Sequence, residues 1–393
     1  MGRVTDSSAS DAAFLARDAV DCLPEGALEH KLGEDRPLRI KLGLDPTAPD
    51  VHLGHTVVLR KLREFQDRGH VVVLIIGDYT ARVGDPSGRS STRPVLSGEE
   101  IDANARTYVE QAATVLDPER IELRHNSEWL DMRMEDLFAL TGTTTVAQLL
   151  ERDDFAKRYA AREPISILEL LYPMMQAYDS VAVRADVELG GTDQKFNLLL
   201  GRDVQRAYGI DEQVALTMPI LPGVDGERKM SKSLGNHIGV TDPPEEMYGK
   251  TLSLPDSAMG SWYELLFGEP APGGLSARDA KHELARRLVE RLHSADAARA
   301  AAAHFERVVV QKGLPEKIQE ARFEGSDGDV HMPALIAEVV GGSRSDARRM
   351  LSQGAVKLDG EPLGGDDLDV SPERLDGAIL QVGKRQFRRL RAG

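Results

Sequence analysis

The sequence has little of several features that would assign a protein to a class at once. It contains one cysteine, Cys22, so no disulfide can form within the chain, which is typical of proteins from a reducing compartment. The first dozen residues lack the apolar stretch of a secretory signal, and the longest apolar run, Val71 to Ile76, is too short to span a bilayer. These features predict a soluble, cytoplasmic protein that does not associate with a membrane.

An excess of basic residues is also missing. The formal net charge is −15, which argues against a general nucleic-acid binder. The charge is uneven, because residues 331–393 hold ten Lys and Arg against nine Asp and Glu, a net of +1, while the rest of the chain carries −16. Basic residues cluster at Arg344, Arg348 and Arg349 and again from Lys384 to Arg391. Such a local basic face either holds phosphates or is simply a solvated surface.

The order of apolar and polar segments predicts an α/β fold with a Rossmann-like parallel sheet. A strand-like segment, a helical one and a β-branched run follow one another with short connections, which indicates a right-handed βαβ unit: 39–44, 55–68 and 71–76. A similar alternation returns in a second set: 168–178, 187–191 and 194–208. Ligands of such sheets bind at the carboxyl ends of the strands.

With 393 residues, of which 41% are hydrophobic, the chain is long enough for two or three domains. We predict a catalytic domain over 1–240, with a mostly helical insertion at about 99–164, and a helical domain over 241–324. GSDGD at 325–329 is predicted to be a linker. A small α+β domain over 331–393 would contain a helix at 344–351, a strand at 355–358 and a final strand at 378–382.

His52-Leu53-Gly54-His55 is the first segment with chemical potential. Two histidines at i and i+3 share a helix face, and three interpretations are open. A metal pair would need further ligands, and no Cys pair or HExxH pattern supplies them. The residues can also be ordinary polar ones at a loop and helix. In a nucleotide site, the helix start and the imidazoles would meet phosphate, and Gly54 would let a base approach the backbone.

Lys229-Met230-Ser231-Lys232-Ser233 is the second such segment. Two lysines three residues apart in a Ser- and Gly-rich loop suit a polyphosphate, although a lone lysine pair is usually a flexible, solvated loop. HLGH followed well downstream by KMSKS resembles the two signatures of class I aminoacyl-tRNA synthetases, and the resemblance covers essentially the whole chain. Further segments resemble the tyrosyl-tRNA synthetases: KLGLDPTAPDVHLGH at 41–55, GDPSGRSSTR at 84–93, NSEWL at 126–130, YPMMQAYD at 172–179 and GGTDQKFN at 190–197.

The resemblance implies a role for each matching residue. Tyr172, Gln176 and Asp85 match residues that hold the substrate ammonium group, and Asp179 matches the acceptor for the phenol hydroxyl. Residues around the ring match Asn126 and Trp129, and groups around the adenylate match Asp45, Thr47, Asp193 and Gln194. The ATP-activating residues match His52, His55, Lys229 and Lys232, with Gly54 beside them, and a mobile loop near the pyrophosphate matches Arg89 and Arg93. No protein metal site is implied.

Two further points come from the same comparison. Many family members have a tyrosine where this chain has Lys41, as a second partner for the phenol, and a lysine there would either donate to that oxygen or point away. SRSDARRMLSQGAVKLDG at 343–360 with VGKRQFRRL at 382–390 resembles a small RNA-binding module named after a ribosomal small-subunit protein. Its arginines would meet tRNA phosphates, unless the unit is a structural cap. The residues concerned are Arg344, Arg348, Arg349, Lys384, Arg385 and Arg388.

The resemblance therefore implies an enzyme that joins L-tyrosine to tRNA(Tyr) through tyrosyl-adenylate, using ATP and Mg²⁺. It also implies a homodimer, with a weak cue in the apolar residues Val146, Leu149, Leu150 and Phe155. Two alternatives stay open at this point. One is the tryptophanyl enzyme, which shares the scaffold; the other is an RNA-binding paralogue without catalysis. The helix with Tyr172, Gln176 and Asp179 argues against the first, and the intact HLGH and KMSKS segments argue against the second.

Overall fold

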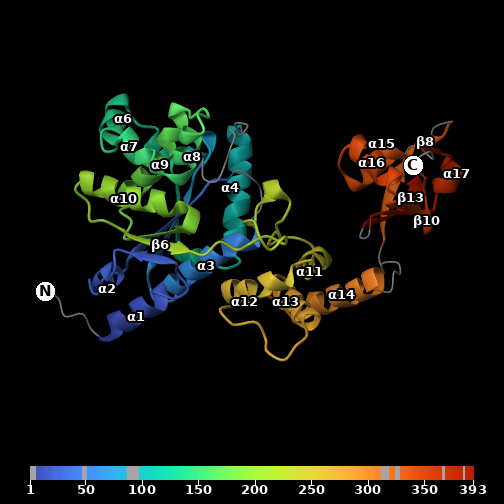
Figure 1. Ribbon diagram of the computed structural model, residues 1–393, viewed down its shortest axis with the longest axis horizontal. Coiled ribbons are helices and arrows are strands. Elements are labelled where there is room, and N and C mark those ends of the chain that lie inside the picture. The colour runs from blue at the N-terminus through green and yellow to red at the C-terminus, as the bar shows by residue number, and fades with distance from the viewer. Residues whose placement is uncertain are drawn as a thin grey trace. The chain divides into compact units, whose positions relative to one another are not determined.

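The computed structural model describes residues 6–46, 51–85, 97–310, 318–323, 328–364, 368–383 and 386–393 (Figure 1). Its contacts divide the chain into two compact units. The first unit comprises Met1–Pro243 and Lys250–Ala285, and the second comprises Pro244–Gly249 and Arg286–Gly393. The predicted catalytic segments all fall in the first unit, and the predicted RNA-binding segment falls in the second.

A six-stranded sheet forms the centre of the first unit, in the order β1-β6-β5-β2-β3-β4. All neighbours are parallel except β1, which runs antiparallel to β6. The predicted strands at 39–44, 71–76 and 187–191 are confirmed. The bounds are β1 Asp21–Leu23, β2 Arg39–Leu44, β3 Val71–Ile76, β4 Ile121–His125, β5 Val187–Gly191 and β6 Val214–Met218.

The chain reverses its direction of travel across this sheet at β2. From β2 it moves outward through β3 to β4, and it then returns to β5 on the other side of β2 and continues to β6. Two predicted helices make these crossovers, α3 (Leu53–Gln66) and α10 (Lys195–Ala207). Right-handed crossovers in opposite directions place them on opposite faces of the sheet, and they appear on either side of β6 in Figure 1. The reversal leaves an opening at the carboxyl ends of β2 and β5.

Local sequence explains why the main elements form where they do. β3 is a run of Val, Leu and Ile whose last five residues are all buried, as expected for a central strand covered on both faces. Helix α9 (Ile167–Ala182) begins with a capping box in which Ser166 Oγ accepts from the Leu168 amide and Glu169 bonds back to the Ser166 amide. The apolar side of α9 packs with α10 and with two short helices, α6 (Met134–Thr141) and α7 (Val146–Leu149).

The segment 99–164, predicted as a mostly helical insertion, also contributes a strand to the main sheet. It is mostly helical, as predicted, with α4 (Gly98–Ala112), α5 (Ser127–Leu130), α6, α7 and α8 (Asp153–Ala160). It also contains β4, which pairs in parallel with β3 at the edge of the main sheet. β4 is only partly buried, so its pattern of apolar residues is too weak to predict a strand.

Helices account for most of the remaining described chain before residue 311. Helix α13 (Ala277–Leu292) begins after Ser276, whose Oγ accepts from the Asp279 amide at 3.1 Å. No described helix is long and apolar enough to cross a membrane. The remaining helices are α1 Asp6–Ala16, α2 Ala27–Leu32, α11 Pro244–Leu252, α12 Met259–Phe267, α13 Ala277–Leu292 and α14 Ala295–Phe305.

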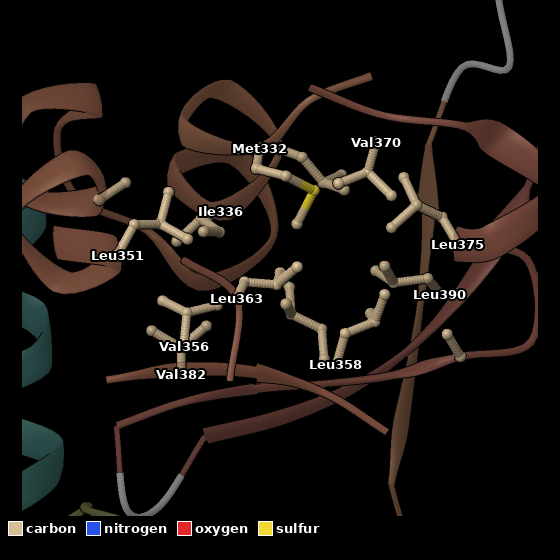
Figure 2. Close-up of a cluster of buried hydrophobic side chains, with 14 of the residues drawn as sticks. Met332, Ile336, Leu351, Val356, Leu358, Leu363, Val370, Leu375, Val382 and Leu390 are labelled. Atoms are coloured by element: carbon tan, nitrogen blue, oxygen red, sulfur yellow. The ribbon is translucent and has the colours of Figure 1, made fainter. Parts of the chain in front are cut away.

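The end of the second unit is a five-stranded sheet, in the order β10-β9-β12-β13-β7, with two helices packed on it. The helices are α15 (Met332–Val340) and α16 (Arg344–Ser352). Figure 2 shows their side chains, including Ile336 and Leu351, facing Val356, Leu358 and Val382 of the sheet across one apolar core. The strands are β7 Gln319–Phe323, β9 Val356–Leu358, β10 Glu361–Pro362, β12 Ile379–Val382 and β13 Gln386–Ala392. A short helix, α17 (Pro372–Leu375), and a strand pair, β8 (Val330–His331) with β11 (Asp369–Val370), complete it.

The structure differs from the sequence prediction in the last strand of this region and in where the region begins. The predicted final strand, now β12, is followed by a longer one, β13, which pairs with it in antiparallel register. β13 also pairs in parallel with β7, which lies before the predicted linker at 325–329. The sheet therefore includes residues from Gln319 onward, N-terminal to the predicted boundary at 331. Residues 325–327 of that linker lie outside the described residues.

Candidate active site

A cavity of about 420 Å³ opens at the carboxyl ends of β2, β3, β5 and β6, where the chain reverses its direction across the sheet. The structure brings most of the predicted site residues to this one cavity, although they come from segments far apart in the sequence. Those that line it are Asp45, His52, Gly54, His55, Asp85, Tyr172, Gln176, Asp179, Asp193, Gln194 and Lys229.

Asp45 follows directly after β2 and joins two walls of the cavity. Its Oδ2 accepts a 2.8 Å bond from the Tyr172 hydroxyl, and its Oδ1 accepts a 2.7 Å bond from Thr80 Oγ1. Gly77, at the end of β3, has no room for a side chain, since a Cβ there would lie 2.1 Å from Asp45 Oδ1. Burial and the nearby Asp45 carboxylate raise the pKa of Tyr172 well above its usual value, so this phenol stays protonated and remains a donor.

Asp179 is the buried carboxylate of the cavity, with 3% of its surface exposed. Trp129 Nε1 donates to its Oδ1 at 2.8 Å, and Asn126 Nδ2 approaches its Oδ2 at 3.5 Å. Burial raises the pKa of Asp179 to about 7, while the Lys41 cation and the two hydrogen bonds oppose that rise. Trp129 and Asn126 were predicted around a ring pocket; the structure places them as donors that orient Asp179.

Gln176, three residues before Asp179 on α9, belongs to a network of side-chain amides. Gln176 Oε1 accepts from Asn197 Nδ2 at 2.8 Å, and Asn197 Nδ2 also reaches Gln194 Oε1 at 3.0 Å. Gln194 Nε2 donates to Asp85 Oδ2 at 2.9 Å. Behind them Arg152, only 4% exposed, donates to Asp85 Oδ1 at 3.2 Å. Carboxylate, phenol and amide oxygens converge here, and such acceptors suit an ammonium group.

HLGH lies at the start of α3 and faces the same cavity. The His52 amide donates to His55 Nδ1 at 3.1 Å, so the neutral His55 ring carries its proton on Nε2. Burial, together with the Lys232 charge, lowers the pKa of His55 to about 4, and burial with the His55 ring lowers the pKa of His52 to about 2. Both imidazoles are therefore neutral at pH 7. A Cβ on Gly54 would lie 3.0 Å from the His52 ring, so any larger residue there would force that ring to shift.

The KMSKS segment places cations beside these histidines. Lys229 Nζ lies 3.2 Å from Asp193 Oδ2, at the carboxyl end of β5. Lys232 begins a short 3₁₀ turn, Lys232–Leu234, and its charge lowers the pKa of both His52 and His55. Neutral N–H donors and ammonium groups at one wall, with no bulky side chain at Gly54, form a surface suited to a polyphosphate.

Several residues of this site were missed by the sequence reasoning. Thr80 and Gly77 have a signal that was available, because both follow the carboxyl end of a predicted parallel strand. Asn197, Arg152 and Glu188 act through side-chain contacts that no local pattern reveals. Tyr108 of α4 also lines the cavity, with its ring 6.1 Å from that of His55. Five predicted residues lie outside the described residues: Thr47, Arg89, Arg93, Lys384 and Arg385.

Within the described part of the chain, no group of three or more His, Cys, Asp or Glu side chains is arranged to hold a metal ion.

The predicted tRNA-binding arginines of α16 lie on the surface of the second unit. Arg344, Arg348 and Arg349 are exposed, and Arg349 pairs with Asp346 at 2.9 Å. Arg388 differs, because it is half-buried and its guanidinium donates to the carbonyl oxygens of Val339 at 3.1 Å and Phe387 at 2.9 Å. Arg388 thus ties β13 to the end of α15.

Sequence comparisons agree with this geometry. Residues 33–310 match the model of the family described as tRNA synthetases class I (W and Y). A tyrosine–tRNA ligase of Moorella thermoacetica is 51% identical over 394 residues, covering 96% of this chain and 94% of that protein. A tyrosine–tRNA ligase of Thermotoga maritima is 48% identical over 392 residues, covering 97% of each.

Solved structures agree as well. The tyrosyl-tRNA synthetase of Archaeoglobus fulgidus in complex with L-tyrosine has a TM-score of 0.61 and 25% identity, covering 75% of this chain and 99% of that one. A C-terminally truncated mitochondrial tyrosyl-tRNA synthetase of Aspergillus nidulans shares the fold, with a TM-score of 0.62 and 24% identity over 76% of this chain and 93% of that one. The chain therefore belongs to the tyrosyl-tRNA synthetase family of class I.

Proposed function

We propose that this chain activates L-tyrosine with ATP to form tyrosyl-adenylate and then transfers the tyrosyl group to the 3′ end of tRNA(Tyr). The observation that carries the substrate choice is the buried Asp179 carboxylate, oriented by Trp129 at one end of a cavity whose other end holds neutral histidines and Lys229. The near full-length likeness to tyrosine–tRNA ligases supports the same activity.

At the amino-acid end, Asp179 accepts the phenol hydroxyl of tyrosine. Phenylalanine would leave this buried carboxylate without a partner, and that loss would favour tyrosine. Tyr172, Gln176 and Asp85 hold the ammonium group through their oxygens, with Gln194 next to them on the carboxylate side. These groups fix the substrate carboxylate relative to the ATP end of the cavity, which is a positioning effect.

At the ATP end, a carboxylate oxygen of tyrosine attacks the α-phosphorus of ATP. The bond from that phosphorus to the bridging oxygen breaks, and pyrophosphate leaves with the electron pair. His52 and His55 donate neutral hydrogen bonds, and Lys229 and Lys232 add positive charge where negative charge develops on the phosphates. Asp45 and Asp193 lie beside the adenylate ribose and phosphate. Thr47, Arg89 and Arg93 are proposed for the same end on sequence resemblance alone.

Magnesium is proposed as the ion that ATP brings on its phosphates. It would neutralise part of the negative charge of the phosphates. In the second step, a hydroxyl of the terminal tRNA ribose attacks the carbonyl carbon of the adenylate, and AMP leaves. This chemistry needs no covalent link to the enzyme.

The tRNA is proposed to contact the exposed arginines of α16, Arg344, Arg348 and Arg349, together with Lys384 and Arg385. The second unit contains these residues while the chain as a whole is acidic, so phosphate contacts would concentrate there. Arg388 would contact the tRNA only through those guanidinium N–H groups that do not donate to the carbonyl oxygens of Val339 and Phe387. The three-domain division of the sequence analysis remains a prediction.

A homodimer is proposed through the face formed by α6 to α9. Apolar side chains on this face are exposed: Met134, Phe138, Val146, Tyr159, Ile167 and Leu168. Ile167 is 78% exposed and Phe138 is 65% exposed, which is unusual for large apolar residues on adjacent helices. Of the four apolar residues in the sequence cue, Val146 is exposed and Leu150 partly so, whereas Leu149 and Phe155 are buried within the subunit.

We place the enzyme in the cytoplasm, where protein synthesis consumes charged tRNA. A cysteine that is free in the structure, Cys22, is consistent with a reducing compartment.

The experiment that tests the proposed function is amino-acid-dependent exchange of pyrophosphate into ATP. Purified protein with Mg²⁺ is expected to exchange with tyrosine and far less with phenylalanine or tryptophan, and to charge tRNA(Tyr) with tyrosine. Equal exchange with tryptophan would point to the tryptophanyl enzyme. Tyrosine-independent tRNA binding without exchange would point to a non-catalytic RNA-binding protein.

A further inference from the structure

Lys41 and Glu188 form an ion pair that is removed from water almost completely. They are register partners on the adjacent parallel strands β2 and β5, and their side chains are 0% and 1% exposed. Lys41 Nζ lies 2.9 Å from Glu188 Oε1. Two charges at such a depth cost much solvation free energy unless hydrogen bonds satisfy both groups.

The Lys41 ammonium uses its three protons on three acceptors. It donates to Glu188 Oε1, to Ser180 Oγ at 2.7 Å and to the carbonyl oxygen of Gln176 at 2.9 Å. An ammonium group has three N–H donors, so none remains for a ligand. Lys41 therefore has no proton left to donate to the substrate hydroxyl. Its hydrogen bonds to Gln176 and Ser180 instead hold α9 against the sheet.

Glu188 in turn holds the side chain of Gln176. Its Oε1 accepts from Gln176 Nε2 at 3.2 Å, and its Oε2 accepts from Ser180 Oγ at 3.0 Å and from Gln213 Nε2. Because Gln176 Oε1 also accepts from Asn197, the Gln176 amide is fixed at both ends while it lines the cavity. The pair thus secures one predicted tyrosine-binding side chain directly.

The same pair acts on Asp179, which directly precedes Ser180 on α9. Lys41 binds α9 through Gln176 and Ser180, on either side of Asp179 in the sequence. The groups that face the Asp179 carboxyl are Trp129 and Asn126 by hydrogen bonds and Lys41 and Glu188 by charge. Of the two charges, the lysine has the larger effect and keeps the pKa of Asp179 lower than burial alone would.

We propose that Lys41 and Glu188 are positioning residues for tyrosine recognition, which hold Gln176 and Asp179 of α9 in place against the sheet without touching the substrate. The inference rests on the proposed assignment of Gln176 and Asp179 to tyrosine. It explains why a lysine occurs at this position beside the pocket: its partner is the carboxylate on the next strand.

The test compares Lys41→Met with Lys61→Met in pyrophosphate exchange. Lys61 is a matched control, because it is also 0% exposed and pairs with one carboxylate, Glu64, at 2.5 Å, but on α3 away from α9. We expect Lys41→Met to raise the KM for tyrosine about tenfold or more, the effect of losing charge-assisted hydrogen bonds, and to reduce the preference for tyrosine over phenylalanine. The KM for ATP should stay within about twofold for both variants.

A second variant, Lys41→Met/Glu188→Gln, decides the matter if the single variant does not fold, because it leaves no unpaired buried charge. It should also raise the KM for tyrosine. In both Lys41 variants the loss of tyrosine binding on acidification should begin at a higher pH than in the wild type, because the cation near Asp179 is gone, whereas Lys61→Met should not move it. A merely structural role would lower stability and leave these readouts unchanged.

The outcomes separate this inference from the proposed function. If the wild type exchanges pyrophosphate with tyrosine and the double variant has the wild-type KM and the wild-type pH profile, the positioning inference is overturned and the proposed function stands. If the wild type shows no exchange with tyrosine at all, the proposed function itself is wrong.

Discussion

The indole N–H of Trp129 points at Oδ1 of Asp179 over 2.8 Å, while the second oxygen, Oδ2, has only a 3.5 Å approach from Asn126. One oxygen is thus engaged by the protein, and the other is better placed to accept a bond from a ligand. Since Asp179 lines the cavity and is buried, its protonation state decides how well it can accept a hydroxyl.

The first prediction concerns pH. The pKa of Asp179 is raised from 3.8 to about 7, so in the empty enzyme the carboxyl gains a proton as the pH falls below about 7. Binding of the tyrosine hydroxyl favours the ionised form, so the KM for tyrosine should rise by up to about tenfold per pH unit below 7. Steady-state exchange between pH 5.5 and 8.5 measures this, with Asp179→Asn as the control that should lack the rise.

The same shift predicts a change in stability. The folded state holds the Asp179 proton up to about pH 7, whereas an unperturbed carboxyl releases it near pH 3.8. The contribution of this group to stability is therefore fully present below about pH 4 and is lost as the pH rises to about 7. The difference in unfolding free energy between wild type and Asp179→Asn should change in that window. A constant difference would contradict the raised pKa.

The second prediction concerns His55 as a neutral donor. With Nδ1 occupied by the His52 amide and the pKa lowered to about 4, Nε2–H is the group of His55 that is left to donate to a proposed phosphate. His55→Asn keeps an N–H donor and should retain more of the adenylation rate than His55→Ala, which should lose about 10²-fold or more. The kcat/KM for ATP at saturating tyrosine should show no limb near pH 6.5 from this residue. A limb there would mean that the imidazolium is the active form.

The third prediction concerns Lys232. Lys232→Ala should slow formation of tyrosyl-adenylate by about 10²-fold while leaving tyrosine affinity nearly unchanged, because the charge acts on phosphates in the transition state. Single-turnover kinetics and equilibrium tyrosine binding measure the two effects separately. Its removal should also raise the pKa of His55, which the Lys232 charge lowers. An unchanged single-turnover rate would reject the assignment.

The fourth prediction concerns tRNA. Arg344→Ala and Arg348→Ala remove exposed charges of α16, so each should weaken tRNA binding and reduce the salt dependence of the binding constant by about one counterion. Pyrophosphate exchange should not change. Arg206→Ala is the control, since Arg206 is 61% exposed but lies on the first unit. Arg388→Ala should instead lower stability, because Arg388 holds two backbone carbonyls.

The fifth prediction concerns assembly. Phe138→Asp and Ile167→Asp place charges on the exposed apolar face of α6 and α9 and should convert a dimer into monomers at micromolar concentration. Val20→Asp is the matched control, because Val20 is also apolar and 57% exposed but lies before β1. Light scattering gives the mass. A monomeric wild type would reject the proposed dimer.

The sequence alone determined the central elements and many, but not all, of the residues that meet at the cavity. β3 has the predicted bounds because a run of buried, mostly β-branched residues between polar turns has few other structures available, and β2, with fewer such residues, also has the predicted bounds. The order of HLGH, the α9 segment and KMSKS sufficed to predict that His55, Asp179 and Lys229 share one site, and all three line it.

Tertiary structure decided what depends on partners distant in the sequence. β4 has a weak pattern and becomes a strand because β3 offers it an edge, and β7 joins its sheet only through β13. The direction of Lys41 was open in the sequence, since a lysine can donate to any nearby acceptor. Glu188, placed opposite it by the register of two parallel strands, settles that direction. A single sequence shows local periodicity. It does not show which buried charged residues will lie opposite each other, because that depends on how the strands pair.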